Sequence, residues 1–213
     1  VTLPILANEA CWALGNITYT AIYARIGTSA AASIQICSTV MNLFMIVTFG
    51  LANAAVVIIG NEIGANRESE AISASKKISS LSFKISILLA IVLAFLSKPI
   101  VSFFNVSVEV KIASEYILYV YAFILVFKIY NAVMIVGILR GGGDATYGSI
   151  LQGLTLWLIG IPLAAFAAFI IKLPIYFVVM FAAVEEIIKV FFMMKRFKSF
   201  KWIKNMVNDE QNE

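Results

Sequence analysis

The sequence predicts an all-α integral membrane protein with six transmembrane helices. Of the 213 residues, 62% are hydrophobic and only 13% are charged, and the mean hydropathy is +0.95. A soluble domain carries about 25% charged residues, so few water-soluble folds could bury this much apolar surface. The apolar runs are continuous rather than alternating with a period of two, which favours helices over the strands of a β-barrel.

Each of the apolar runs is long enough to cross a bilayer, which takes about 20 helical residues. In chain order the expected spans cover residues 3–24, 30–60, 78–97, 115–138, 146–171 and 174–194. The second run is long enough to tilt or to extend beyond the membrane. Together the runs form one lobe, 1–194, which is followed by a cytoplasmic, basic-then-acidic tail over 195–213.

The connections between the expected spans are short, with two exceptions. Residues 61–77 are polar and carry most of the loop charge, whereas residues 98–114 are mixed and are expected to lie at the membrane interface. At the end of the second run, Gly60 and Gly64 have the spacing of small residues that allows close helix approach. With the alanines that precede them, these glycines predict a closely packed seam.

The distribution of lysine and arginine predicts the orientation, because these residues are enriched in short loops on the cytoplasmic side. Nine of them flank the spans on the side of the 61–77 loop, Arg140 and the C-terminal tail, against four on the other side. The richer side is therefore expected to be cytoplasmic, with both ends of the chain inside the cell.

Several function classes are excluded by what the sequence lacks. There is no histidine, so no imidazole serves a proton relay, a Ser-His-Asp triad or a zinc site. Cys11 and Cys37 lie inside apolar runs without metal-ligand spacing, so no metal or cofactor is expected. The sequence shows no arrangement of a nucleophile and a base that would indicate an enzyme. The net charge of +4 suggests contact with anionic lipid headgroups rather than with nucleic acid.

Charged residues within the expected spans require an explanation, because burying charge in a membrane is unfavourable. Four candidates stand out: Glu9, Lys128, Glu185 and Glu186. Glu185 can pair with Lys189 one turn later on the same helix face. Glu9 has no partner at helical spacing, so it is expected to exchange a proton, to bind a cation or to make a structural hydrogen bond. Lys128 is interpreted as a counter-charge for Glu9 or for another carboxylate, or as a gate.

Polar and aromatic side chains in the same runs are further candidates for coupling or for substrate contact. These candidates are Asn8, Tyr19, Tyr130 and Asn131. Aromatic rings can meet a cationic ligand through cation–π contact. The alternative is that these rings pack in the core or anchor the helices at the membrane interface.

The stretch "GILRGGGDATY" separates two apolar runs. Arg140 at a helix end matches the positive-inside preference and can bond to the last helical carbonyls. Gly141, Gly142 and Gly143 permit a tight reversal with positive φ, and Asp144 is expected to cap the next helix with its side chain. The phosphate-binding pattern GxxxxGK[ST] is absent. The loop is therefore expected to hold two helices antiparallel rather than to bind a nucleotide.

Four stretches resemble motifs of the multidrug and toxic compound extrusion (MATE) transporters, in the order of that family. "LPILANEACWALG" is similar to the start of the seventh helix, and "ARIGTSAAAS" to the turn into the eighth. "GLANAAVVIIGNEIGA" is similar to the end of the eighth helix, and "LRGGGD" to the loop between the tenth and eleventh. Together the stretches cover about residues 3–65 and 128–162.

The resemblance implies twelve helices in two six-helix lobes that rock against each other to give alternating access. This chain corresponds to the second lobe, and its start without an initiator Met suggests that an N-terminal six-helix lobe is missing. The implied activity is export of amphipathic, cationic drugs or toxic compounds in exchange for H⁺ or Na⁺ across a bacterial cytoplasmic membrane. The alternatives are a related flippase of lipid-linked precursors and a non-transporting six-helix fragment.

The family's coupling residues carry over only in part. Some members form a cation site from a glutamate on the seventh helix and an aspartate on the tenth. Glu9 lies on the helix that matches the one carrying the family's glutamate. The position that matches the family's aspartate falls near Ile129, beside Lys128, and no acidic residue is found there. A lysine there repels a bound cation, so the resemblance does not imply a two-carboxylate Na⁺ site in this lobe. Proton coupling through a residue of the missing lobe is expected instead, with Glu9 in a secondary role.

Overall fold

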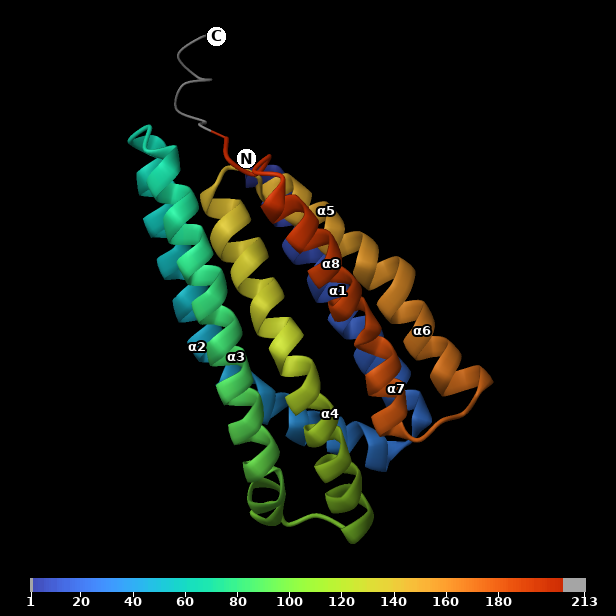
Figure 1. Ribbon diagram of the computed structural model, residues 1–213. Helices are drawn as coiled ribbons and strands as arrows, with labels where there is room; N and C mark the ends of the chain where they lie inside the picture. The colour runs from blue at the N-terminus through green and yellow to red at the C-terminus, as the bar shows by residue number, and fades with distance from the viewer. Residues whose placement is uncertain (1, 205–213) are drawn as a thin grey trace.

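Six helical rods run alternately up and down, so Thr2 and Lys204 lie at the same end of the molecule, here called the terminal end (Figure 1). The computed structural model describes the backbone of residues 2–204 and the side chains of residues 9–204. In chain order the helical segments are α1 Thr2–Ile26, α2 Thr28–Gly64, α3 Glu68–Ser102, α4 Val108–Ala132, η1 Val133–Leu139, α5 Ala145–Thr155, η2 Leu156–Gly160, α6 Ile161–Ala165, η3 Phe166–Ile170, α7 Ile175–Ala182 and α8 Val184–Lys198. The segments η1, η2 and η3 are π-helical turns within the rods.

The described residues confirm the predicted all-helical class. Four rods are long and apolar enough to cross a membrane: Thr28–Gly64, Glu68–Ser102, Val108–Leu139 and Ala145–Ile170. The first rod, α1, and the last, α7–α8, coincide with the expected spans 3–24 and 174–194. The last rod is interrupted at Ala183.

The helices are longer than the apolar runs that predict them. Helix α3 begins inside the polar segment 61–77, with Glu68 and Glu70 in its first turn, where the helix dipole favours carboxylates. It ends inside the segment 98–114. Polarity alone therefore misplaces the helix ends, because a helix can continue past the membrane into water.

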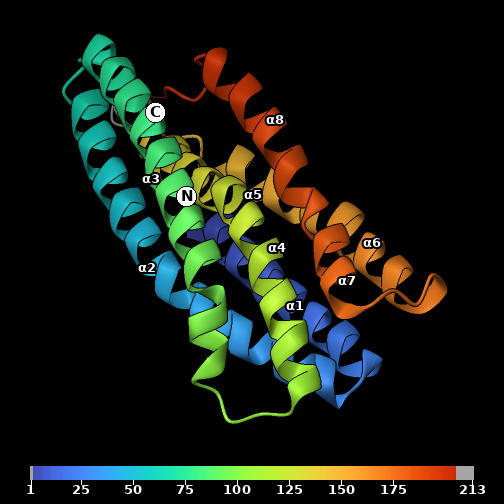
Figure 2. The same cartoon turned by 60° about the horizontal axis from the view of Figure 1, so that its bottom comes forward.

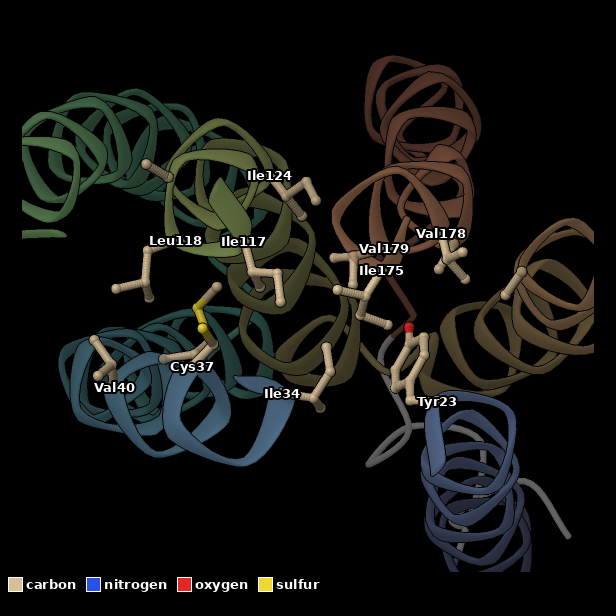
Figure 3. Packing of buried hydrophobic residues seen from close by; sticks show 14 of the residues in the cluster. Tyr23, Ile34, Cys37, Val40, Ile117, Leu118, Ile124, Ile175, Val178 and Val179 are labelled. Carbon is tan, nitrogen blue, oxygen red and sulfur yellow. The ribbon is translucent and has the colours of Figure 1, made fainter. Parts of the chain in front are cut away.

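The rods surround two buried apolar clusters. One cluster lies away from the terminal end and joins α2, α4 and α7, with Cys37, Ile117 and Val178 among its fully buried members (Figure 3). The other lies toward the terminal end and joins α2, η1 and the chain after α8. Many large apolar side chains are exposed on the outer surface, as Phe95 and Leu43 illustrate. Such a surface fits a lipid surrounding.

Helices α3 and α4 pack through a line of small side chains. Ser75, Ser82, Ser86 and Ser97 of α3 are fully buried, and each hydroxyl donates to a carbonyl three residues earlier in the same helix. These hydroxyls are therefore satisfied without a partner on another helix. Small residues let helix backbones approach closely in a membrane.

The seam predicted for α2 lies against η1 and the loop that follows it. A Cβ atom on Gly137 would lie 2.9 Å from the Cβ atom of Ala55, and one on Gly141 would lie 3.0 Å from the Cα atom of Val56. By contrast, a Cβ atom on Gly64 would meet nothing within 4 Å. The seam residues of α2 are thus close-packed. The glycines that this close approach requires are Gly137 and Gly141, which lie opposite α2.

Candidate functional site

Two cavities lie between the two sides of the lobe. Figure 2 shows α2 and α3 on one side of the molecule and α6, α7 and α8 on the other, with α4 and α1 between them. The larger cavity has a volume of about 540 Å³ and the smaller about 310 Å³. Ligand pockets measure about 300–1,000 Å³, so the larger can hold a small molecule. Both cavities are lined by Trp12, Lys128, Gln152, Glu186 and Lys189.

The cavity wall contains a buried cluster of two carboxylates around one ammonium. Lys189 Nζ lies 3.6 Å from Glu185 Oε2 and 3.3 Å from Glu186 Oε1. The pair of Glu185 and Lys189 was predicted from their spacing and is confirmed. Glu186 shares the same ammonium and also accepts a hydrogen bond of 2.7 Å from Asn131 Nδ2 on α4. Only 6% of the Lys189 side chain is exposed.

The interruption at Ala183 explains how two adjacent glutamates both point inward. Helix α8 begins directly after it, so Glu185 and Glu186 lie in its first turn, where free backbone N–H groups and the helix dipole favour anions. Successive helical residues point about 100° apart, so one carboxylate faces α1 and the other α4. Lys189, four and three residues later, lies between them.

Gly160 at the end of η2 makes room for the cluster. A Cβ atom at this position would overlap the hydroxyl of Tyr19 and would lie 3.1 Å from Cδ of Glu185. Tyr19 therefore extends from α1 into the cavity wall beside Glu185, and it lines the larger cavity. A larger residue at position 160 would require Tyr19 and Glu185 to shift.

Lys128 lies in the cavity wall without an ion pair. It is half-buried on α4 and lines both cavities, and no salt bridge joins it to a described carboxylate within 4 Å. The interpretation of Lys128 as the counter-charge of Glu9 is wrong. Glu9 Oε1 lies 3.6 Å from Arg140 Nη2, and its side chain is 56% exposed.

The other candidates fall in different places. Asn131 belongs to the cluster, and Glu9 and Arg140 line the smaller cavity. Tyr130 lines neither cavity: it is buried on α4 and its hydroxyl lies 3.0 Å from the hydroxyl of Ser79 on α3. The packing alternative therefore describes this tyrosine. The side chain of Asn8 lies outside the described residues.

The expectation that Asp144 caps the next helix with its side chain is wrong. The carboxylate makes no capping hydrogen bond and is instead paired with two cations of the C-terminal segment. Its oxygens lie 2.7 Å from Arg196 Nε and 2.6 Å from Lys204 Nζ, and the residue is 1% exposed. A charge this deeply buried requires such partners.

The glycine loop is a docking point for the chain after α8. Gly143 has φ 85°, the positive value that the reversal requires. Trp202 is fully buried and lies so close to Gly142 that a Cβ atom there would overlap the indole ring. The backbone N–H of Lys204 donates to the carbonyl of Gly142 at 2.8 Å. The segment expected to form a tail from residue 195 is therefore helical to Lys198 and packed through residue 204.

Some polar residues of the cavity were missed by the sequence analysis. Gln35, Ser38 and Gln152 all line the larger cavity. Their only signal in the sequence is that each interrupts an apolar run. Uncharged polar residues also occur in packed helix contacts, as the serines of α3 do, so this signal does not single out a cavity.

Helices long and apolar enough to cross a membrane surround a polar cavity, which is the architecture of a multi-pass membrane protein. The sequence profile of the MatE family matches residues 4–166. The chain therefore belongs to the MatE family, as the resemblance of its four stretches indicated.

Solved structures of the same fold are similar to this chain over about half of their own length. A MOP superfamily transporter from Pyrococcus furiosus, described as having a binding pocket of reverse polarity that suggests a different function, has a TM-score of 0.88 at 16% identity. The match covers 98% of this chain and 46% of that one. A MATE in complex with MaD3S has a TM-score of 0.89 at 16% identity, over 98% of this chain and 47% of that one.

A third structure, the Vibrio cholerae MATE transporter VcmN in the bent form, has a TM-score of 0.76 at 14% identity. This match covers 94% of the present chain and 46% of that one. No curated protein matches the sequence. The chain thus has the fold of one lobe of a twelve-helix MATE-like transporter.

Proposed function

We propose that this chain is the C-terminal half of a secondary active antiporter, which exports amphipathic compounds in exchange for H⁺ or Na⁺ by alternating access. Membership of the MatE family and a match to about half of each solved transporter support this proposal. The partner in the transport cycle is an N-terminal six-helix lobe. We place the protein in a bacterial cytoplasmic membrane, and the distribution of lysine and arginine supports an orientation with both ends of this chain inside the cell.

The observation that carries the proposal is the buried cluster of Glu185, Glu186 and Lys189 in a cavity wall. Burying an ionisable residue inside a membrane protein costs free energy, so such residues usually serve a function. Two carboxylates share one ammonium, so the three residues carry one excess negative charge when all are ionised. A proton or a Na⁺ ion that binds there cancels this charge, and alternate occupancy of the cavity by the ion and the substrate would couple their movements.

The cluster is a better candidate for coupling than Glu9. Glu9 is more than half exposed and paired with Arg140, whereas the side chains of Glu185 and Glu186 are only 9% and 14% exposed. Glu9 remains a candidate for a secondary role, because it lines the smaller cavity.

Irregular helix turns surround the cluster. The π-helical segment η1 follows Asn131, η2 ends at Gly160, and the break at Ala183 precedes the two glutamates. Such turns often occur at functional sites, and breaks in membrane helices are typical of transporter binding sites. We propose that these turns accommodate the helix movements of alternating access.

The test is transport by the natural gene product, including any lobe that is encoded upstream. The protein is reconstituted in liposomes, and a pH gradient or a Na⁺ gradient is imposed while amphipathic fluorescent dyes of either charge are followed. We expect one gradient to drive dye movement, and Glu185→Gln combined with Glu186→Gln to abolish it. The matched control is Glu70→Gln, because Glu70 is exposed at the start of α3.

Absence of dye movement under both gradients would support the non-transporting alternative. Movement of a lipid-linked compound, but of no soluble dye, would support the flippase. If the double variant transports normally, the cluster has no part in coupling.

A further inference from the structure

We propose that the compounds bound in this cavity carry an acidic group, a carboxylate or a phosphate, which Lys128 binds. This inference rests on the proposed function, because it names the substrate class of the same site. A purely cationic compound does not fit the charges described below, whereas an amphipathic acid or a zwitterion does.

Lys128 is the one charged group in the wall of the larger cavity that lacks an ion-pair partner among the described residues. The charged residues that line this cavity are Lys128, Glu185, Glu186 and Lys189. Both glutamates lie within 3.6 Å of the Lys189 ammonium. The ammonium of Lys128, half-buried and facing both cavities, is therefore available to a ligand.

An organic cation that enters the cavity has to compete with Lys189 for both carboxylates. Glu186 directs one oxygen to Lys189 and the other to Asn131. Glu185 lies between Lys189 and the wall formed by Tyr19 and Gly160. Lys128 adds direct repulsion of a cation.

Neutral donors and apolar side chains complete an environment for an amphipathic acid. Gln152 and Trp12 line both cavities together with Lys128, and amide and indole N–H groups can donate to a carboxylate or phosphate. Ile34, Met41 and Leu156 line the larger cavity and offer apolar contact. A few polar groups in a partly apolar wall are typical of small-molecule sites.

The competing explanation is that Lys128 only balances the excess negative charge of the buried cluster. In that case its replacement would reduce stability without changing the charge preference of the site. The two explanations are separated by measuring binding of two ligands that differ only in the sign of their charge.

The experiment measures fluorescence titrations of the purified natural gene product with dansylglycine, an acid, and dansylethylenediamine, an amine with the same fluorophore. The variants are Lys128→Gln and Lys128→Arg. The control is Lys84→Gln, because Lys84 is exposed on α3 and lines neither cavity. We expect the acid to bind more tightly than the amine. Lys128→Gln should weaken acid binding by about tenfold or more, as loss of a charged hydrogen bond does.

Lys128→Arg should retain most of the acid affinity, and Lys84→Gln should change neither ligand. Tighter binding of the amine to the unmodified protein, or unchanged acid affinity in Lys128→Gln, would overturn the proposal. If Lys128→Gln does not fold, the affinities of the acid and the amine are compared on the unmodified protein and on Lys128→Arg. Tighter binding of the acid to both proteins supports the proposal, and tighter binding of the amine overturns it.

Competition with farnesyl phosphate identifies the source of the acidic group. Displacement of dansylglycine indicates a lipid phosphate, and its absence indicates a soluble acid; both results support an acidic substrate. These titrations need no ion gradient, so they separate the two proposals. Acid binding through Lys128 without gradient-driven transport would refute the antiporter alone, whereas gradient-driven transport with unchanged acid binding in Lys128→Gln would refute the acid site alone.

Discussion

Gly160 is the position where a single methyl group should disturb the cavity wall. The variant Gly160→Ala would place a Cβ atom against the Tyr19 hydroxyl and the Glu185 carboxylate. We expect destabilisation of about 1–3 kcal/mol, as overpacking in a core produces, and a loss of gradient-driven transport. Thermal unfolding of the purified protein and flux in liposomes measure the two effects.

Gly153 provides the matched control for this prediction. It lies in the preceding helix α5, and an added Cβ atom would meet nothing within 4 Å. Alanine is the better helix former, so Gly153→Ala should be neutral or slightly stabilising. Equal destabilisation by both variants would show that the contact with Tyr19 and Glu185 is not the cause.

Replacing Lys189 should lower stability because it leaves two buried carboxylates without a counter-charge. Lys189→Met removes the shared ammonium from Glu185 and Glu186. Breaking a buried pair costs about 3–5 kcal/mol because an uncompensated charge remains, so we expect a large fall in folded yield and in the thermal unfolding temperature. Combining this variant with Glu185→Gln and Glu186→Gln should recover part of the loss. Failure of the triple variant to recover would indicate that packing of the lysine stem is the larger contribution.

At the scale of single residues, the sequence predicted contacts within one helix and missed contacts between helices. The pairing of Glu185 with Lys189 follows from a fixed spacing of four residues. The pairing of Glu9 with Arg140 joins α1 to the helical end of the rod that contains η1, and no periodicity in the sequence predicts it. The same limit explains why Glu9 was offered as one possible partner of Lys128, although Glu9 is paired with Arg140.

At the scale of elements, the glycine loop and the chain after α8 form one unit. The variant Asp144→Asn would remove the carboxylate that holds Arg196 and Lys204. We expect release of residues 199–204 and a loss of about 1–3 kcal/mol of stability, because a buried charged hydrogen bond is lost. Limited trypsin digestion measures the release as faster cleavage after Lys201.

Glu62→Gln is the control for Asp144→Asn. Glu62 is paired with the mostly exposed Arg67 at the same end of the molecule, and exposed pairs contribute about 0–1 kcal/mol. This variant should leave cleavage after Lys201 unchanged. Unchanged cleavage in Asp144→Asn would mean that Trp202 holds the segment by packing alone.

The number and order of the elements were predictable, but their ends were not. Apolar runs report where a helix crosses lipid, and the runs at 78–97 and 115–138 lie within α3 and within α4 with η1. The polar turns of α3 outside the membrane give no apolar signal. The cap expected of Asp144 was also reasonable locally, since an aspartate before a helix often caps it. The two cations come from residues 52 and 60 positions later.

At the scale of the whole molecule, the terminal end should face the cytoplasm. With Cys11 replaced by alanine and Cys37 buried, single cysteines at Ser69 and Asn105 report on the two ends. These residues lie at the start of α3 and in the connection to α4, respectively. In intact cells a membrane-impermeant maleimide should label Asn105→Cys and leave Ser69→Cys unlabelled until the cells are opened. The reverse pattern would invert the orientation.

The four charges of the larger cavity have an electrical consequence for the transport cycle. With Lys128, Glu185, Glu186 and Lys189 all ionised, the charges sum to zero. A membrane potential of 100 mV acts on each net charge that crosses with about 2.3 kcal/mol. In the proposed transport cycle, an empty lobe with no net charge in this cavity would respond weakly to the membrane potential. The potential would then act mainly on the loaded carrier, with a sign set by the substrate and the coupling ion.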